Sequence, residues 1–244
     1  ELTKTETIDA MDAIGSNIRV DSRDGKVLRV LPRLNENINE EWISDKTRYA
    51  IDGLSKQRLD TPYIKIKNKL QPTTWEGAFE KINDKLSKVS SSEVAAIIGD
   101  QVDIESIFAL RKLFEKINSK KIALSQYDYD LISGNRSNYL FNSHINGVEK
   151  CDSILLVGVN PRLNAPIINA RIRKNFLNRD IKIASLASNK FNLNYDYNYL
   201  GNDIKALNDV YNEKNDFGKV LKNSNFPMII IGDEVLKSPE SRNV

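Results

Sequence analysis

The stretch Asp152-Ser153-Ile154-Leu155-Leu156-Val157-Gly158 is a short, strongly apolar run, and Val159-Asn160-Pro161 follows it directly. A continuous apolar run of this length that ends at a glycine is typical of a strand buried on both faces of a parallel sheet. Apolar residues then recur at helical spacing at Ile167, Ile168, Ile172 and Phe176. Residues 181–186 form the next apolar run, so the sequence predicts a β–α–β unit over 152–186.

The same alternation extends to both sides of this unit. Further strands are predicted at 93–99, 122–124 and 228–232, and a second helix at 104–117. Thr73 and Glu76 have the spacing of a capping box and predict the start of another helix. Its predicted apolar face comprises Trp75, Ala78, Phe79, Ile82 and Leu86. Alternating strands and helices predict an α/β fold with a parallel, Rossmann-like sheet and flanking helices.

Residues 1–60 have a different pattern. Two β-prone runs, 18–20 and 27–31, flank Arg23-Asp24-Gly25-Lys26, and Asp-Gly between such runs predicts a hairpin because both residues tolerate positive φ. We therefore expect a small β-rich lobe at 1–60, followed by an α/β domain at 61–244. The sequence opens without Met and ends in a polar tail, so we expect a piece cut from a longer protein, with the α/β domain truncated.

Composition excludes several classes of function. The 244 residues carry 36 Lys and Arg against 33 Asp and Glu, a net charge of +3 without a basic stripe, so we expect no nucleic-acid partner. No run approaches the roughly 18 apolar residues of a spanning helix, so we expect no direct membrane insertion. One Cys and one His cannot supply the ligands of a zinc or iron–sulfur site, and one Cys cannot form an internal disulfide.

The loop from Gly158 to Pro166 is the sharpest local signal for a ligand site. Ligands of open α/β sheets bind outside the carboxyl ends of strands, where a glycine lets the backbone approach and a helix N-terminus offers free N–H groups. The loop matches neither G-x-G-x-x-G nor G-x-x-x-x-G-K-[ST]. Two interpretations stay open: a nucleotide site, or an ordinary tight β–α turn ended by proline.

Other candidate residues favour structural roles. The basic residues Arg162, Arg171, Arg173 and Lys174 could meet a phosphate or an acidic partner, but we interpret them as a solvated helix face. Cys151 is expected to pack as a small hydrophobe rather than act as a nucleophile. His144 has no Ser or Cys elbow nearby that would suggest catalysis. Asn135-Arg136-Ser137 spells a glycosylation sequon, which has no meaning without a secretory route.

Residues 4–18, 39–50, 157–162 and 169–174 together closely resemble the large iron–sulfur subunits of respiratory complex I. These are the G subunit of the bacterial NADH-quinone oxidoreductase and the 75 kDa subunit of the mitochondrial enzyme. The resemblance implies a part in electron transfer from NADH to quinone, coupled to proton translocation. It also implies contacts with other subunits of the peripheral arm, at the cytoplasmic face of the bacterial inner membrane or the matrix side of the mitochondrial one.

The C-terminal part of that subunit resembles the molybdopterin oxidoreductases, whose first lobe holds a [4Fe–4S] cluster through four cysteines. Those positions fall on Asp9, Asp12, Ser16 and Ser44 in this sequence. Carboxylates and hydroxyls do not replace the soft thiolates that a cluster needs. The resemblance therefore implies a lobe that survives without its cluster, and we expect packing by Trp42 and Tyr49 to hold it together.

Gly158, Asn160 and Pro161 match the family's pterin contact region, and we interpret them as a vestigial loop. We expect no catalytic residue, no metal and no cofactor in this segment. The resemblance places one [2Fe–2S] and two [4Fe–4S] clusters N-terminal to it. The main hypothesis is thus a cofactor-free structural scaffold within complex I. The alternative is a catalytically active molybdopterin- or nucleotide-binding oxidoreductase domain.

Overall fold

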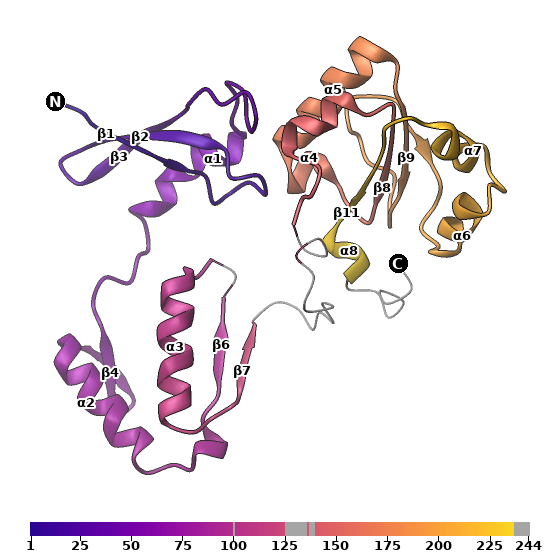
Figure 1. Cartoon of the computed structure of the whole chain (residues 1–244). Helices are drawn as coiled ribbons and strands as arrows, with labels where there is room; N and C mark the ends of the chain where they lie inside the picture. The colour runs from indigo at the N-terminus through magenta and orange to yellow at the C-terminus, as the bar shows by residue number, and fades with distance from the viewer. Residues whose placement is uncertain (100, 125–135, 137–139, 237–244) are drawn as a thin grey trace. The chain divides into compact units, whose positions relative to one another are not determined.

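The computed structural model describes residues 1–99, 101–124, 136 and 140–236, which form two compact units (Figure 1). Glu1–Leu54 and Tyr129–Val244 form the first unit, and Ser55–Asp128 form the second. These units are defined by packing, and the division predicted at residue 60 stays a prediction. Asn135 and Ser137 of the sequon and the tail from residue 237 lie outside the described residues.

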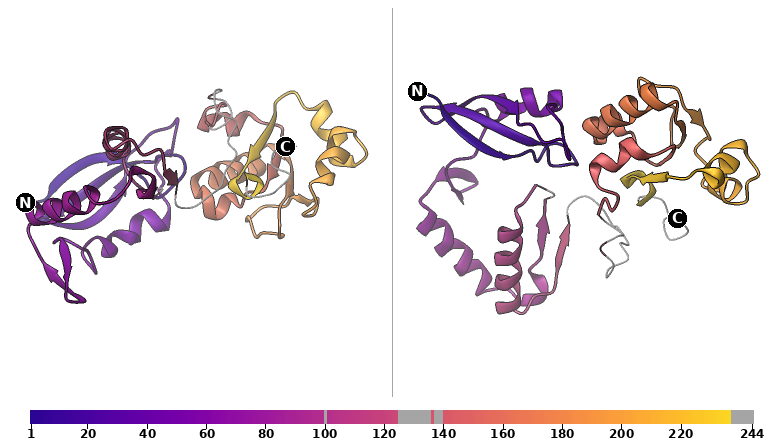
Figure 2. Two further views of the ribbon diagram at one scale, coloured as in Figure 1. Left: turned by 90° about the horizontal axis from the view of Figure 1, so that it is seen from below. Right: turned by 45° about the horizontal axis from the view of Figure 1, so that its top comes forward.

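The N-terminal lobe of the first unit is an antiparallel sheet in the order β1-β2-β3. Its strands are β1 (Thr3–Ile8), β2 (Asn17–Arg23) and β3 (Lys26–Pro32), which lie side by side in Figures 1 and 2. Asp24 and Gly25 have φ values of 51° and 76°, which confirms the predicted Asp-Gly hairpin. β1 was not predicted, because its residues alternate among polar types and it is exposed along its whole length.

The core of the lobe differs from the one expected. α1 (Asp45–Tyr49) and the 3₁₀ helix η1 (Ala50–Leu54) follow the sheet. Ile18, Val30 and Ile43 form the buried cluster. The expectation that Trp42 and Tyr49 hold the lobe together was wrong, because their side chains are 57% and 69% exposed. The smaller neighbouring residue Ile43 is buried instead, because it packs with Ile18 and Val30 of the sheet.

The α/β part of the first unit contains a four-stranded sheet with the order β10-β9-β8-β11, in which every pairing is parallel. Its strands are β8 (Ser153–Val157), β9 (Lys182–Leu186), β10 (Asn198–Tyr199) and β11 (Pro227–Ile231). The predicted strands at 152–158, 181–186 and 228–232 are therefore confirmed within one or two residues. All five residues of β8 are buried, as a central strand of a parallel sheet requires.

Helices cover both faces of this sheet. The helices are η4 (Ile145–Lys150), α4 (Pro161–Asn164), α5 (Pro166–Arg179), α6 (Lys205–Tyr211), α7 (Asp216–Asn223) and α8 (Asp233–Leu236). Successive side chains of a strand point to opposite faces. Ile154 and Leu156 accordingly pack with Ile172 of α5, whereas Leu155 and Val157 pack with Phe217 of α7. In Figure 1, α5 and α7 lie on opposite sides of β8 and β9.

The second unit holds two small sheets. β4 (Tyr63–Ile66) and β5 (Lys69–Pro72) form an antiparallel hairpin, and β6 (Ala96–Ile98) and β7 (Ile122–Leu124) form a parallel pair. The 3₁₀ helix η2 (Ser91–Glu93) precedes β6, and α3 (Ile104–Lys116) joins β6 to β7. The predicted strands at 93–99 and 122–124 thus pair in parallel, but in a sheet separate from β8–β11.

The capping prediction in this unit was wrong by one residue. α2 (Trp75–Leu86) begins after Thr74, whose hydroxyl accepts the Gly77 N–H at 3.2 Å. The capping box with both reciprocal hydrogen bonds lies instead at Ser90 and Glu93. Within the described residues, no helix is both long and apolar enough to cross a membrane.

Candidate functional site

The four positions that match cluster ligands all lie buried in the lobe. Their exposed fractions are 5% for Asp9, 7% for Asp12, 0% for Ser16 and 7% for Ser44. Thr47 links two of them, because its hydroxyl donates to Asp9 Oδ2 at 2.5 Å and lies 2.8 Å from Ser44 Oγ. We call these five residues the lobe pocket. The predicted residues thus belong to one buried polar group, which Thr47, unmarked in the sequence, completes.

Local backbone geometry sets the positions of these side chains. Ser44 caps α1 and accepts the Thr47 N–H at 3.1 Å, which turns the Thr47 hydroxyl toward Asp9. The Asp9 N–H donates to the Ser16 carbonyl at 2.8 Å, so the loop between β1 and β2 closes on itself. Asn39, which is fully buried, accepts the Asn17 N–H at 2.8 Å and fixes the next turn against β2.

Asp12 and Ser16 differ from the rest of the lobe pocket. Both carboxylate oxygens of Asp12 and the hydroxyl of Ser16 are buried without a hydrogen-bond partner among the described residues. Burial raises the pKa of Asp12, and the charge of Asp9 raises this pKa further. Backbone N–H groups of Ile14, Ala13 and Ile167 face Asp12 and oppose that rise, but none of them reaches hydrogen-bond geometry with its oxygens.

The lobe pocket does not fit an iron–sulfur cluster. Such clusters are held by cysteine thiolates, and this group offers two carboxylates and three hydroxyls. The only cysteine, Cys151, is buried in the apolar cluster with Ile154 and Ile172, and its thiol lies 3.4 Å from the Gly147 carbonyl. Cys151 therefore packs as a small hydrophobe, as predicted, and burial raises the pKa of its thiol.

The second predicted site, the Gly158 loop (residues 158–161), lies where β8 ends. Gly158 has a φ of 57°, and a Cβ there would lie 2.6 Å from Val235 Cγ2 and 2.9 Å from the Val235 backbone nitrogen. The glycine is therefore required by the close approach of α8. Pro161 is buried at the first position of α4, and the Asn160 N–H donates to Asn164 Oδ1 at 3.2 Å.

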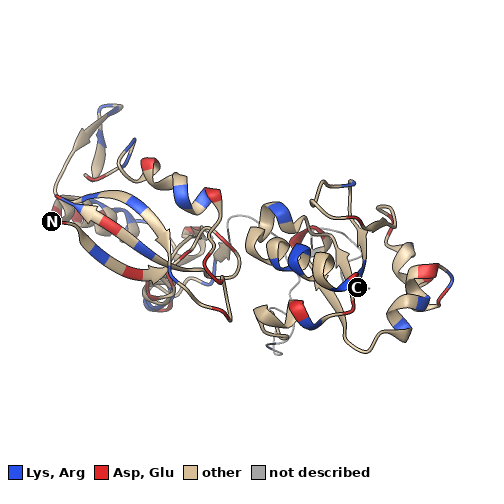
Figure 3. Cartoon of the chain, turned by 90° about the horizontal axis from the view of Figure 1, so that it is seen from above, with Lys and Arg blue, Asp and Glu red and all other residues tan. Residues whose placement is uncertain are grey.

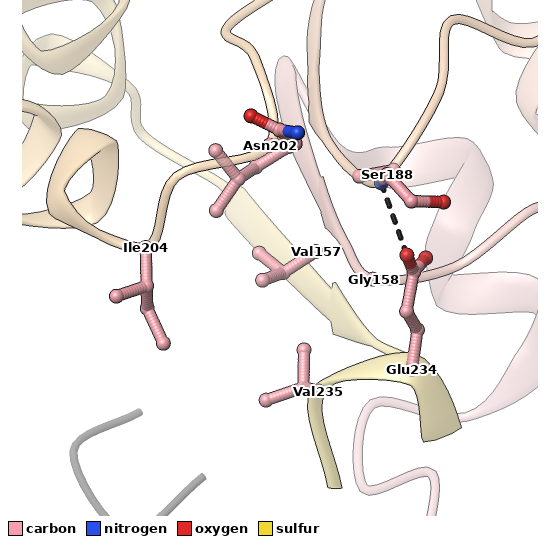
Figure 4. Close-up of a pocket in the computed structure, with 9 residues that line it drawn as sticks. Val157, Gly158, Ser188, Asn202, Ile204, Glu234 and Val235 are labelled. Atoms are coloured by element: carbon pink, nitrogen blue, oxygen red, sulfur yellow. Dashed lines mark hydrogen bonds between the residues drawn. The ribbon is translucent and has the colours of Figure 1, made fainter. Parts of the chain in front are cut away.

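Figure 4 shows what faces this loop. A cavity of about 230 Å³ lies at the carboxyl ends of the strands and is lined by residues that include Val157, Leu186, Asn202 and Ile204. Glu234 lies beside Gly158, and its Oε1 accepts the Ser188 N–H at 3.0 Å. The cavity is smaller than the roughly 300–1,000 Å³ of typical small-molecule sites. The Glu234 carboxylate also accepts a hydrogen bond from the Ser188 N–H, a backbone donor that could otherwise bind a phosphate.

A larger hollow lies at the opposite end of the strands. It measures about 520 Å³ and is lined by Phe176, Lys182, Tyr197 and Asp216 among others. It lies at the amino-terminal end of β9, whereas ligands of open α/β sheets bind at the carboxyl ends. Residues of α5, β9, β10 and α7 and of the loops beside them line it, so no local sequence signal marks it.

Three of the four basic residues, Arg162, Arg173 and Lys174, are exposed as predicted, and Arg171 is the exception. Arg171 is only 2% exposed, and its guanidinium contacts the carboxylate of Glu149. It also donates to the carbonyls of Ile38 at 3.0 Å and Glu36 at 2.6 Å. Arg171 therefore fastens α5 to the N-terminal lobe. Our interpretation was wrong for this residue, because helical spacing cannot show that a separate segment covers it.

Lys174, one turn along α5, contacts both Glu40 and Glu149. Arg173 and Arg162 are exposed and donate to backbone carbonyls of Asn194 and Asn192, at 3.2 and 3.0 Å. In the view of Figure 3, basic and acidic segments are interspersed over the described elements. This distribution offers no stripe of one sign for a phosphate backbone.

The chain matches two family models. The model of molybdopterin oxidoreductase matches residues 58–244, and the model of the NADH-ubiquinone oxidoreductase NDSU1/NuoG-like 4Fe-4S domain matches residues 2–52. The second match covers the lobe that contains the lobe pocket. The chain therefore contains a region that matches a 4Fe-4S domain, but this region has no cysteine.

Two curated relatives cover nearly the whole chain. The G subunit of the NADH-quinone oxidoreductase of Rickettsia felis is 44% identical over 235 residues, which are 96% of this chain and 35% of the relative. The mitochondrial NADH-ubiquinone oxidoreductase 78 kDa subunit of Candida albicans is 44% identical over 252 aligned residues, covering 100% of this chain and 34% of the relative. The chain thus spans about a third of the length of these relatives.

Among solved structures, the acetylene hydratase from Pelobacter acetylenicus has a similar fold. The TM-score is 0.53 at 15% sequence identity, over 78% of this chain and 28% of that one. At this identity the likeness concerns the fold alone. With the family models and the curated relatives, it leads to one conclusion: the chain belongs to the molybdopterin oxidoreductase family, and its predicted resemblance to the large iron–sulfur subunits of complex I is confirmed.

Proposed function

We propose that the chain is a cofactor-free structural part of the large iron–sulfur subunit of complex I. In this role it supports neighbouring cluster-bearing domains and offers surface to other peripheral-arm subunits, while the complex passes electrons from NADH to quinone. The Rossmann-like α/β domain and the degenerate cluster lobe act as architecture. This segment keeps the neighbouring redox centres at fixed distances from one another, because electron transfer between them depends on their spacing.

The observation that carries this proposal is the chemistry of the lobe pocket. Two carboxylates and two hydroxyls stand at the four thiolate positions, and a hard oxygen set does not hold iron–sulfur centres. Support comes from the Gly158 loop, where Val235 and Glu234 occupy the space beside the glycine. Both features are seen in this chain, and their assignment to cofactor positions rests on the family resemblance.

The salt-bridge group formed around the buried Arg171 by Glu149, Glu40 and Lys174 supports the mechanical role. It joins α5 to the lobe through charged hydrogen bonds, which are among the stronger polar contacts in proteins. Because Arg171 is internal, reversing its charge tests this joint and not a partner surface. Arg173, which is exposed, remains the residue with which to test a partner contact.

The proposal is tested on the purified native assembly. Molybdenum and tungsten are measured by mass spectrometry, and pterin by the fluorescence of its oxidised products. We expect neither metal and no pterin. A stoichiometric amount of either would overturn the proposal in favour of a molybdopterin enzyme, and the Gly158 loop would then be the place to locate the cofactor.

Iron provides the second test. A variant with four substitutions would place thiolates at these positions of the lobe pocket: Asp9→Cys, Asp12→Cys, Ser16→Cys and Ser44→Cys. We expect wild-type iron content to be fully explained by clusters outside this chain, and the four-cysteine variant to gain up to four iron atoms. If the wild-type and a variant with all four positions changed to alanine differed by a cluster's worth of iron, this segment would not be cluster-free.

A further inference from the structure

The two edges of the four-stranded sheet differ in how they are protected from further pairing. At one edge, β10 has only two residues, Asn198 and Tyr199, and offers few free backbone groups. At the other edge, β11 has five residues, which read Met-Ile-Ile-Ile after Pro227 and carry no charge. Native proteins shorten or charge their edge strands, because a long apolar edge pairs with other strands. β10 meets this expectation, and β11 does not.

The backbone of β11 can accept one more strand. β11 pairs with β8 on its inner side, and the Gly232 N–H extends this ladder by donating to the Val157 carbonyl at 2.8 Å. Backbone groups of successive residues point to opposite sides of a strand, so those of Ile229 and Ile231 point to the outer edge. Among the described residues, β8 is the only strand that pairs with β11.

One face of β11 is also uncovered. Met228 and Ile230 pack in the apolar cluster that contains Ile172 of α5, on one face of the sheet. Ile229 and Ile231 lie on the opposite face, in register with the two β8 residues that pack with α7, and each is 54% exposed. Apolar side chains gain stability when they are removed from water, so this face favours a further apolar covering.

The order of the strands indicates what covers this edge. Counted along the chain, β10-β9-β8-β11 is the order 3-2-1-4. Doubly wound sheets commonly extend this order to 3-2-1-4-5-6, which places the fifth strand beside the fourth. Crossover connections are right-handed, and α5 runs over one face from β8 toward β9. A connection from β11 in the opposite direction must therefore pass over the other face, which carries Ile229, Ile231 and α8.

We propose that β11 pairs in parallel with a fifth strand from the same polypeptide, outside residues 1–244, and that the helix leading to this strand covers Ile229 and Ile231. The argument for this source is length. The chain spans about a third of the curated relatives, so a polypeptide of their size has ample residues for a further β–α unit. The inference concerns how the sheet is completed. It goes beyond the proposed function and does not depend on whether a cofactor binds.

Hydrogen exchange in the native assembly, resolved to single residues by electron-transfer fragmentation, tests the pairing without any substitution. The amides of Met228 and Ile230 point inward to β8 and serve as internal references. We expect the amides of Ile229 and Ile231 to exchange within about tenfold of these references, because paired amides must open before they exchange. Faster exchange of the two outward amides would show an unpaired edge and overturn the proposal.

Thiol labelling tests whether the side chains are covered. Ile229→Cys should react with N-ethylmaleimide about a hundredfold more slowly in the native assembly than in denaturant, as expected of a site that reacts only when it opens. Tyr211→Cys is the matched control, because Tyr211 of α6 lies on the same side of the sheet and is 85% exposed. Its native and denatured rates should agree within about tenfold. The same agreement for Ile229→Cys would contradict a covering helix.

Photo-crosslinking identifies the source of the strand. Phe226 directly precedes β11 and is 63% exposed, so Phe226→p-benzoylphenylalanine keeps an aromatic side chain at a tolerant position. Neighbouring strands lie roughly 4.8 Å apart, within reach of this group. Mass spectrometry of the illuminated assembly should identify a cross-linked peptide of the same polypeptide from outside residues 1–244. A cross-link to a different subunit, or to a second copy of this one, would assign the strand to a partner and overturn the proposal.

Discussion

The lobe pocket and the Gly158 loop are the two regions that the sequence resemblance relates to cofactor sites of the family, and their packing differs. In the lobe pocket, polar residues replace the ligands and three of their oxygens stay unpartnered. At the Gly158 loop, Val235 and Glu234 of α8 lie against the glycine. Among the described residues, three oxygens therefore lack a partner in the first region, whereas in the second α8 packs against a glycine that still lines a cavity of about 230 Å³.

Under the proposed function, this difference corresponds to two ways in which a fold can lose a cofactor. A buried ligand set can change its chemistry while the backbone around it stays, because the loop from Asp9 to Ser16 is held by its own hydrogen bond. A surface cradle can instead be filled by neighbouring side chains, which contribute apolar packing that a ligand would otherwise supply. Both regions retain unsatisfied atoms, since Asn160 Oδ1 beside Gly158 is also buried without a hydrogen-bond partner in the described part of the chain.

The largest effect is expected at the joint between the lobe and α5, on which the shape of the lobe pocket depends. Arg171→Met should destabilise the protein by about 3–5 kcal/mol, because it leaves Glu149 and two backbone carbonyls without their buried cation. Denaturant unfolding measures the change. Arg173→Met, on the exposed face of the same helix, is the control and should stay within about 0.5 kcal/mol.

The Gly158 loop and the lobe pocket can also be compared through one glycine in each region. Gly158 and Gly15 have similar φ values, 57° and 64°, but a Cβ at Gly15 meets nothing within 4 Å. Gly158→Ala should cost about 2–4 kcal/mol, from left-handed strain and the clash with Val235. Gly15→Ala should cost about 1 kcal/mol from strain alone. Equal costs in urea unfolding would contradict the claim that α8 fills the Gly158 loop.

A third effect contrasts Asp12 with Asp21, another buried carboxylate of the lobe. Hydrogen bonds from Arg19 and Arg29 lower the pKa of Asp21, so the folded state holds this proton less tightly than the unfolded state does. The stabilisation is therefore present above the ordinary pKa of about 3.9 and is lost as pH falls through the lower folded value.

Asp21→Asn should accordingly be less stable than the wild type at neutral pH and approach it in acid. Unfolding measured from pH 6 down to pH 2 checks this, with Asp24→Asn as an exposed control that leaves the slope unchanged. A constant gap between wild type and Asp21→Asn over this range would mean that the arginine pairs do not depend on the charge of Asp21.

The smallest effect is expected at Glu234. Glu234→Gln keeps an acceptor for the Ser188 N–H and removes the negative charge beside Gly158, so stability should change by less than about 0.5 kcal/mol. If the carboxylate alone excluded a phosphate, the variant would bind nucleotide. We expect no heat on titration with ATP or GTP in either protein, because Val235 also occupies the space. Heat seen only with Glu234→Gln would show that charge, not packing, closes the loop.

Sequence patterns predicted the elements whose signals are local. The apolar run at β8 marked a central strand because a strand covered on both faces must be apolar throughout. Asp24-Gly25 predicted the hairpin because few residues adopt positive φ readily. The residues that the resemblance assigns to the four thiolate positions could be named from the sequence alone, and that assignment stays a prediction.

Tertiary structure decided the features that depend on distant segments. Arg171 is buried because carbonyls of Glu36 and Ile38 cover it from 133 and more residues away, which helical spacing cannot reveal. α8 closes the Gly158 loop because β11 pairs beside β8 and brings Val235 there. The unpartnered state of Asp12 likewise follows from burial under several segments, including α5. Packing between segments distant in sequence, and not the local pattern, determines which polar groups lose water and which gain a partner.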